Sequence, residues 1–465
     1  MLDPGSTGAL STEPDGTEPD GTDRRRAVPR TDDVLSDPAL QEAVTRLGPV
    51  LVKHAVQQAQ QRCRSGELTP EQVVGAARDA LPRHATRLQR VINASGVVVH
   101  TNLGRAPLSA ASVAALGVAA GATDVELDLV SGRRGRRGRS ALAALAAAVP
   151  EAEGVHVVNN GAAALALVTC ALAGPGRPDA QDLSASARTE VVIARGELVE
   201  IGDGFRIPEL LESMGATIRE VGATNRVRLA DYVAAVGERT AFVLKVHPSN
   251  YVVSGFTSTV GVHELAGLGV PVVVDIGSGL LTPHPRLPDE PSASAALRAG
   301  ADLVTASGDK LLGGPQCGLM LGRTELVERL RRHPFARALR VDKLTLAALE
   351  ATLTGPIAPV LASLASSPEQ LLSRAKRMCA DVRDLVDATA VASEAAVGGG
   401  GAPGVGLPSA AVVLPIRFAE PLRLDAVLPV VGRVEKGRLL LDLVAVDPDD
   451  DQALVDAIRR VAEVV

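Results

Sequence analysis

The sequence has 465 residues, of which 46% are hydrophobic and 22% charged, as expected for a water-soluble chain of about three domains. Its 5 Phe, 2 Tyr and no Trp argue against a platform that stacks single-stranded nucleic acid on aromatic rings. The formal net charge of −6 excludes a chain that is basic throughout, but it is compatible with a local basic surface.

The cysteines and the apolar segments give an expectation for the cellular location of the protein. Met1–Val34 is acidic and lacks an apolar core, so we expect no secretory signal. Ala106–Thr123 is mostly Ala, Gly and Ser, too weakly apolar to span a bilayer. We therefore expect a cytoplasmic protein with no membrane partner. The four cysteines show no metal-ligand spacing, which predicts reduced, inert thiols and no metal site: Cys63, Cys170, Cys317 and Cys379.

Residues 1–34 are of low complexity. Thr12–Gly16 (TEPDG) is repeated at once as Thr17–Gly21. Such a segment buries too little apolar surface to offset its ordering entropy, so residues 1–35 are predicted to be a disordered tail.

Residues 36–90 are predicted to form a small helical unit. Asp37 and Pro38 suit the N-cap and first position of a helix that ends at Gly66. Thr69 and Gln72 match a capping box that begins the next helix, which Pro82 stops. The first helix has an apolar stripe: Leu40, Val44, Leu47 and Leu51.

Short β-branched runs alternate with helical stretches from about residue 91 to 345. Continuous apolar strands between helices indicate a mainly parallel sheet covered on both faces, and hence an α/β large domain. Ligands of such sheets bind beyond the carboxyl ends of the strands. The predicted strands are Val155–Val158, Val191–Ala194, Thr217–Val221, Phe242–Val246, Val272–Asp275, Leu303–Thr305 and Cys317–Leu321.

Residues 346–465 are predicted to form a smaller α+β domain after a long helical stretch. Its predicted strands are Val412–Leu414 and Leu439–Leu443, with a turn at Val434–Gly437. The glycine run Gly398–Gly401 lacks the Lys-Ser/Thr of a phosphate loop, so we interpret it as a flexible connector.

Lysine is scarce enough to be informative, since the chain has only six. A pyridoxal-phosphate (PLP) enzyme needs one lysine at a strand end, facing a carboxylate that keeps the pyridine nitrogen protonated. Lys310 follows the predicted strand Leu303–Thr305, and Asp275 ends the strand Val272–Asp275. These two residues are the predicted cofactor lysine and its carboxylate partner.

The cofactor phosphate needs backbone donors at a helix N-terminus. Asn160, Gly161 and Ala162 supply them directly after the strand Val155–Val158, and Ser307 adds a hydroxyl three residues before Lys310. Each element alone is more often structural, but their ordered combination favours a PLP site.

At this point the sequence resembles the family of bacterial selenocysteine synthases, the L-seryl-tRNA(Sec) selenium transferases. The resemblance runs from about residue 36 to the end. The matching stretches are Ile92–Arg105 (INASGVVVHTNLGR), Arg195–Ile207, Lys245–Thr257, Asp275–Gly279 (DIGSG), Ser307–Gly318, Arg337–Leu346, Gly432–Val434 and Leu439–Leu443.

The resemblance implies a fold-type-I, aminotransferase-like PLP enzyme that converts seryl-tRNA(Sec) to selenocysteinyl-tRNA(Sec). The selenium would come from selenophosphate, by way of a dehydroalanyl intermediate. It also implies a tRNA(Sec)-binding N-terminal unit and a homodecamer built from dimers. Residues carried over by motif are Lys310, which would hold PLP, and Arg105, Asp309, Arg337 and Arg340, which would serve catalysis and the selenium donor.

One loop departs from the family pattern. Where the family often has Glu-Arg-Gly-Ser-Arg-Tyr, this chain has Arg133–Gly138 (RRGRRG), in which Arg134 and Arg137 keep the pattern. Five arginines in Arg133–Arg139 are compatible with a solvated loop or with contacts to phosphate or tRNA.

Two alternative functions remain open at this stage. One is a related PLP lyase acting on a small phosphorylated amino sugar or amino acid, against which residues 36–90 count. The other is a non-catalytic regulator that binds PLP or tRNA, against which Lys310 and the arginine set count.

Overall fold

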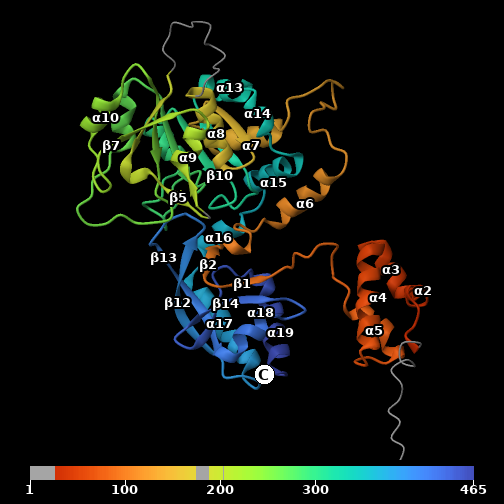
Figure 1. The fold of residues 1–465 in the computed structure, drawn as a ribbon. Coiled ribbons are helices and arrows are strands. Elements are labelled where there is room, and N and C mark those ends of the chain that lie inside the picture. Colours follow the sequence, from red (N-terminus) through yellow and green to blue (C-terminus); the bar gives the residue numbers. More distant parts are fainter. Residues whose placement is uncertain (1–26, 174–187, 203) are drawn as a thin grey trace, which may run out of the picture. The chain divides into compact units, whose positions relative to one another are not determined.

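A computed structural model describes residues 27–173, 188–202 and 204–465 (Figure 1). The described chain divides into two compact units, with the boundary between Arg90 and Val91. Each unit is described by itself.

The N-terminal unit is a small helical bundle with a hydrophobic core of its own, to which Val34, Leu40, Val56 and Val73 contribute. Its capping box is formed, because the Thr69 N–H donates to Gln72 Oε1 at 2.8 Å. The elements are α2 (Thr31–Leu35), α3 (Pro38–Leu47), α4 (Pro49–Arg64), the 3₁₀ turn η1 (Pro70–Gln72) and α5 (Val73–Asp79).

Two expectations for this unit need correction. The predicted tail extends too far, since Thr31–Leu35 is helical and Val34 is buried in the bundle core; residues 1–26 lie outside the described residues. The single helix predicted up to Gly66 is two helices. Gly48 has a left-handed φ of 86° and Pro49 starts a new helix, so the chain turns between them.

The large domain is built on a seven-stranded sheet with the order β3-β11-β10-β9-β8-β4-β7. Neighbouring strands are parallel, except that β11 is antiparallel to both β10 and β3. Each strand lies on a run that the sequence predicts. The strands are β3 (Gly154–Val158), β4 (Glu190–Ala194), β7 (Thr217–Val221), β8 (Thr240–Val246), β9 (Val272–Gly277), β10 (Leu303–Ser307) and β11 (Gly318–Gly322).

Both faces of this sheet are buried, because side chains of each strand alternate between two hydrophobic clusters. On β4, Val191 and Ile193 join one cluster and Val192 and Ala194 join the other. The first face is covered by α8 (Gly161–Leu172), α9 (Ile207–Ser213), α13 (Thr324–Arg332) and α14 (Phe335–Ala338). The second is covered by α7 (Arg139–Ala148), α10 (Leu229–Ala235), α11 (Val262–Leu265), α12 (Ala293–Arg298) and α15 (Lys343–Thr354).

Shorter elements complete the large domain. Helix α6 (Ala110–Ala120) packs against α15. The others are the hairpin β5 (Glu200–Ile201) and β6 (Phe205–Arg206), and the 3₁₀ turns η2 (Thr101–Leu103), η3 (Arg195–Glu197) and η4 (Ala266–Leu268).

The segment Lys343–Ala365 is long and apolar enough to cross a membrane by length and composition alone. It forms two helices, α15 and α16 (Pro359–Ala365), because Gly355 and Pro356 interrupt it. Helix α15 packs against α6 and α7 and buries Leu346 and Leu349.

The small domain has a six-stranded sheet with the order β1-β14-β15-β13-β12-β2. Two of its strands precede the large domain in sequence, so the expected boundary at residue 91 is wrong for β1 (Ile92–Ala94) and β2 (Val97–Val99). The other strands are β12 (Thr389–Gly398), β13 (Gly406–Pro415), β14 (Val430–Glu435) and β15 (Arg438–Asp442). Its remaining elements are α17 (Pro368–Val382), α18 (Ala419–Arg423), α19 (Asp451–Ala462), η5 (Ile416–Phe418) and η6 (Pro448–Asp450).

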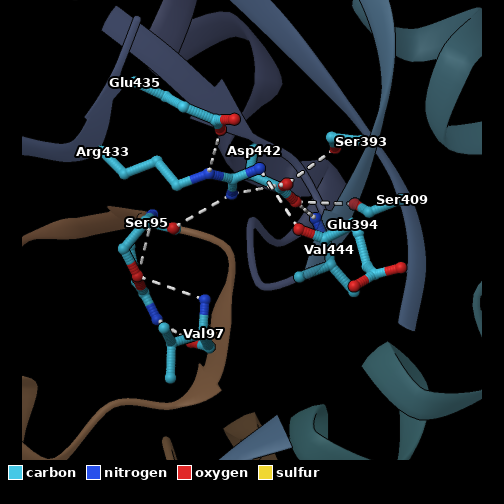
Figure 2. A network of polar contacts seen from close by, with 10 residues as sticks. Ser95, Val97, Ser393, Glu394, Ser409, Arg433, Glu435, Asp442 and Val444 are labelled. Atoms are coloured by element: carbon cyan, nitrogen blue, oxygen red, sulfur yellow. Dashed lines mark hydrogen bonds and ion pairs between the residues drawn. The ribbon is translucent and has the colours of Figure 1, made fainter. Parts of the chain in front are cut away.

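An ion pair between the buried Asp442 and the partly exposed Arg433 holds these strands together (Figure 2). Asp442 is fully buried and accepts hydrogen bonds from the hydroxyls of Ser393 and Ser409 at 2.7 and 2.6 Å. It also accepts from Arg433 Nη1 at 2.9 Å. Removing one member of such a pair typically costs about 3–5 kcal/mol, because the other charge is left buried and unpaired.

The same arginine fixes the turn between β1 and β2. Arg433 Nη1 donates to the Ser95 carbonyl at 3.2 Å (Figure 2). Gly96 has a φ of 80°, and a Cβ there would lie 2.0 Å from Arg433 Nη1. Only glycine fits this position, which explains the Ser95-Gly96 step of the motif Ile92–Arg105.

Candidate active site

Lys310 lies just beyond the carboxyl end of β10, where the sequence predicts the reactive lysine. Its side chain is buried, with the residue 8% exposed. Burial lowers the pKa of the Lys310 amine, while the carboxylates of Asp275 and Asp309 oppose this shift. A buried lysine with a lowered pKa is a nucleophile suited to a carbonyl group.

Asp275 is a buried carboxylate on β9, the strand next to β10. Its Oδ1 accepts a hydrogen bond from the Thr305 hydroxyl at 2.7 Å. Burial raises the pKa of Asp275, whereas the Thr305 hydroxyl and the Lys310 amine act in the opposite direction. A cation that replaces the lost hydration, such as a protonated pyridine nitrogen, would keep this carboxylate ionised.

Arg105 and Asp309 form an ion pair beside Lys310. The Arg105 Nη1 lies 2.6 Å from Asp309 Oδ2. Arg105 adopts a left-handed φ of 68°, and its N–H donates to the His100 carbonyl at 3.0 Å. The Ala106 N–H donates to the Asp309 carbonyl at 3.2 Å, which joins the two segments a second time. The structure therefore brings Arg105, Asp309 and Lys310 together, as the resemblance implies.

The turn after β3 has the form of an anion site. Asn160 caps α8, since its Oδ1 accepts the Ala163 N–H at 2.8 Å. The Gly161 and Ala162 N–H groups belong to the first turn, where donors have no acceptor within the helix. A Cβ on Gly161 would lie 2.6 Å from the Ser307 hydroxyl, so glycine lets this turn meet the end of β10.

The glycine run Gly398–Gly401 connects β12 and β13, but the structure also places it against Lys310. A Cβ on Gly400 would lie 3.4 Å from both Lys310 Nζ and Ser249 Oγ. A Cβ on Gly277 would come within 3.9 Å of the same two atoms. Glycines on both sides thus leave space around the lysine amine and the Ser249 hydroxyl. Ser249 is not among the site residues predicted from the sequence.

Glu290 holds this loop in place. Its side chain is 1% exposed, and its Oε2 accepts the Ala402 N–H at 2.7 Å. The same oxygen lies 3.2 Å from His247 Nε2, and the His247 N–H donates to the Asp275 carbonyl at 3.0 Å. Among the described residues, Glu290 Oε1 has no hydrogen-bond partner. The carboxylate therefore ties the small-domain loop to the strand ends that carry Asp275.

A second ion pair joins β8 to the turn η3 that follows β4. Lys245 on β8 is paired with Glu197, whose Oε2 also accepts the Val246 N–H at 3.0 Å. Burial raises the pKa of Glu197 against the opposing effect of Lys245. Both residues line a cavity of about 740 Å³ that His247 and Glu290 also line.

Neither Arg337 nor Arg340 is among the described residues that line this cavity. Arg337 is in α14, which ends at Ala338, so Arg340 lies beyond the end of that helix. Both line a different cavity of about 720 Å³, here called the arginine cavity. Its other cationic lining residues are Arg134, Arg136, Arg137, Arg331 and Arg332.

These residues fit PLP. A buried amine is available for its aldehyde, a buried carboxylate for its ring nitrogen, and a capped glycine turn with the Ser307 hydroxyl for its phosphate. Glycines at 277 and 400 keep the space beside the amine free of side chains.

Comparison with known proteins identifies the family to which the chain is similar. A family described as "L-seryl-tRNA selenium transferase" matches residues 91–447, and one described as "Selenocysteine synthase N terminal" matches residues 25–64. The L-seryl-tRNA(Sec) selenium transferase of Hyphomonas neptunium is 39% identical, over 94% of this chain and 98% of that protein. The one from Edwardsiella ictaluri is 40% identical, over 92% of this chain and 96% of that protein.

Among solved structures, a D-glucosaminate-6-phosphate ammonia-lyase is similar, with a TM-score of 0.56 and 20% identity. The match covers 81% of this chain and 96% of that chain. At this identity the likeness concerns the fold, and it confirms the predicted fold class.

We predict that replacing Glu290 by Ala loosens the glycine loop. The lost hydrogen bond to a charged group is worth about 1.5–3 kcal/mol, so the Ala402 amide should exchange with solvent roughly tenfold to a hundredfold faster. Hydrogen exchange read by NMR or mass spectrometry measures this, with the exposed neighbour Asp289→Ala as the control. Unchanged exchange at Ala402 in Glu290→Ala would contradict the assignment.

Proposed function

The chain belongs to the L-seryl-tRNA selenium transferase family, and on this premise we propose that it converts L-seryl-tRNA(Sec) to L-selenocysteinyl-tRNA(Sec). Selenophosphate is the selenium donor and PLP the cofactor. The observation that carries the proposal is the buried Lys310 beside Asp275 and the capped turn at Asn160, inside the matched range 91–447.

When bound, PLP draws electrons from the seryl α-carbon, which makes loss of the α-proton and of the β-hydroxyl feasible. Lys310 Nζ would hold the cofactor through its aldehyde, and the lysine amine would accept the seryl α-proton and return it. Asp275 keeps the pyridine nitrogen protonated. Gly161, Ala162 and Ser307 hold the phosphate through their N–H and hydroxyl donors.

Arg105 and Asp309 act next to that amine. Their ion pair fixes the segment that carries Lys310 and sets its electrostatic surroundings, since the charges of both residues act on the Lys310 pKa. The Asp309 carboxylate favours the ammonium form and Arg105 the neutral amine, so the pair keeps the lysine able to accept and return a proton.

We assign Arg337 and Arg340 to the selenium donor. Selenophosphate is multiply charged and suits bidentate guanidinium forks. The segment that carries Arg340 is joined to β3, because Val158 bridges Arg340 and the Asn159 N–H donates to the Leu339 carbonyl at 3.1 Å. The phosphate turn at Asn160 follows directly, so the donor site borders the cofactor site.

The N-terminal unit is assigned to tRNA(Sec) recognition. It has its own core and lies outside the residues that form the cofactor site. Structured RNA is recognised by shape and phosphates, which a helical unit can contact. We further propose a cytoplasmic homodecamer built from dimers, as the resemblance to the family implies.

The ammonia-lyase likeness raises the alternative of a PLP lyase acting on a small phosphorylated substrate. Two observations favour the tRNA substrate instead. The identity to that structure is 20%, against 39% and 40% to the two selenium transferases over nearly the whole chain. The N-terminal unit also matches the family's own N-terminal model.

The function is tested by turnover. Purified protein supplied with PLP, seryl-tRNA(Sec) and selenophosphate should form selenocysteinyl-tRNA(Sec), measured as acid-stable selenium on the tRNA. Lys310→Ala should abolish this product while keeping the folded far-UV spectrum, because the lysine is both tether and base. Substantial product from Lys310→Ala would overturn the assignment of Lys310, and none from the native chain would overturn the function.

For the donor site, we expect Arg337→Ala or Arg340→Ala to impair selenium transfer more than PLP or tRNA binding. Removing one hydrogen bond to a charged group costs about 1.5–3 kcal/mol when it is sheltered from water. The KM for selenophosphate should rise accordingly, while the cofactor absorbance stays unchanged. Normal transfer by these variants at limiting selenophosphate would place the donor elsewhere.

Deleting residues 1–90 should leave PLP binding intact and abolish discrimination between tRNA(Sec) and tRNA(Ser). The two units have separate cores, so the second retains its cofactor residues. Comparing the Kd values for the two tRNAs measures the loss, and deleting only residues 1–26 is the control. Retained selectivity after the longer deletion would refute the domain assignment.

A further inference from the structure

The arginine cavity carries more positive charge than its own carboxylates can balance. Glu126 pairs with Arg134, Arg137 and Arg340, at 2.9, 3.2 and 3.7 Å. Glu328 pairs with Arg331 and Arg332, at 2.5 and 3.4 Å. Seven lining arginines thus face two glutamates, a formal excess of 7 − 2 = +5.

Two of these arginines lie outside the ion pairs, although the charge of Arg136 still acts on Glu328. Within the described residues, neither Arg136 nor Arg337 forms an ion pair. His156 also lines the cavity. Burial lowers the pKa of His156 to about 4, and the charges of Arg136 and Arg331 act in the same direction. The histidine stays neutral at pH 7, so the excess charge comes from the arginines. A concave surface with such an excess attracts anions.

Selenophosphate accounts for only part of this charge. The proposed function assigns Arg337 and Arg340 to it, which leaves Arg136 and Arg332 among the cations on the exposed rim. The other substrate is itself a polyanion, since its seryl group is an ester at the 3′ end of an RNA. To bring that ester to Lys310, the last phosphodiesters of the RNA must lie near the strand ends.

The arginine cavity borders these strand ends. Arg340 bridges Val158, and Asn160 caps the helix that follows. A Cβ on Gly161 would touch the Ser307 hydroxyl, three residues before Lys310. The arginine cavity and the segment that carries Lys310 are therefore both close to the turn at Asn160.

We propose that the arginine cavity binds phosphodiester groups of the single-stranded 3′ end of the RNA substrate, through Arg136 and Arg332. The proposal rests on the proposed function and adds a second RNA contact besides the N-terminal unit. Guanidinium forks match phosphate geometry. No Phe, Tyr or Trp is among the described residues that line the cavity, so recognition is by charge and is independent of base sequence.

The test is the double variant Arg136→Ala/Arg332→Ala in the full-length, PLP-loaded enzyme. Arg383→Ala is the matched control, since the side chains of Arg332 and Arg383 are 76% and 75% exposed. The double variant should raise the KM for seryl-tRNA(Sec) by about threefold to tenfold, given the modest strength of exposed charge contacts. The plot of log Kd for this tRNA against log salt should become less steep by about 1.4, or about 0.7 for each phosphate that an arginine no longer neutralises.

Three readouts separate this proposal from its rivals. The KM for selenophosphate and the cofactor absorbance should be unchanged in the double variant. A raised KM for selenophosphate with unchanged tRNA binding would assign the whole cavity to the donor and overturn the proposal. Dissociation of the oligomer in sedimentation, with unchanged tRNA affinity per folded site, would overturn it in favour of a contact between copies. If the native chain and Arg383→Ala both lack turnover, the proposed function fails instead.

Discussion

Keeping the amine of Lys310 out of water is the constraint on which the rest of the site depends. Burial favours the neutral amine, whereas Asp275 and Asp309 favour its protonated form. Arg105 pairs with Asp309 and offsets one of the two carboxylates. Burial and Arg105 thus lower the pKa of Lys310, and the two carboxylates raise it. Such a balance suits a group that must both bind a carbonyl as a neutral amine and carry a proton.

Both domains contribute to that environment. The large domain supplies the strand ends that carry Lys310 and Asp275, while the small domain supplies the loop at Gly400. Glu290 joins the two through the Ala402 N–H. Arg105 follows β2 after the 3₁₀ turn η2, and β2 belongs to the small-domain sheet that Arg433 and Asp442 stabilise. Two separate segments of the chain, the one that carries Arg105 and the glycine loop, therefore connect the small domain to the surroundings of the lysine.

The sequence predicts the large sheet well because its strands are buried on both faces, which makes each a continuous apolar run. Lys310 and Asp275 are predictable for a related reason, since Asp275 ends such a run and Lys310 closely follows another. Contacts between distant segments are not visible in this way. Glu290 contacts His247, 43 residues away in sequence, and Ala402, 112 residues away. No local sequence pattern connects these residues. The break at Gly48 is hidden because an apolar stripe continues across it, although its φ of 86° ends the helix.

The small-domain sheet is assembled from the two ends of the second unit. Ile92 pairs with Val430, so 430 − 92 = 338 residues separate neighbouring strands. During synthesis, β1 and β2 leave the ribosome early but have no strand to pair with until β12 and β14 follow. The large sheet, whose strands all lie between residues 154 and 322, is complete well before then. The segment that carries Lys310 is therefore synthesised before the glycine loop that lies against it.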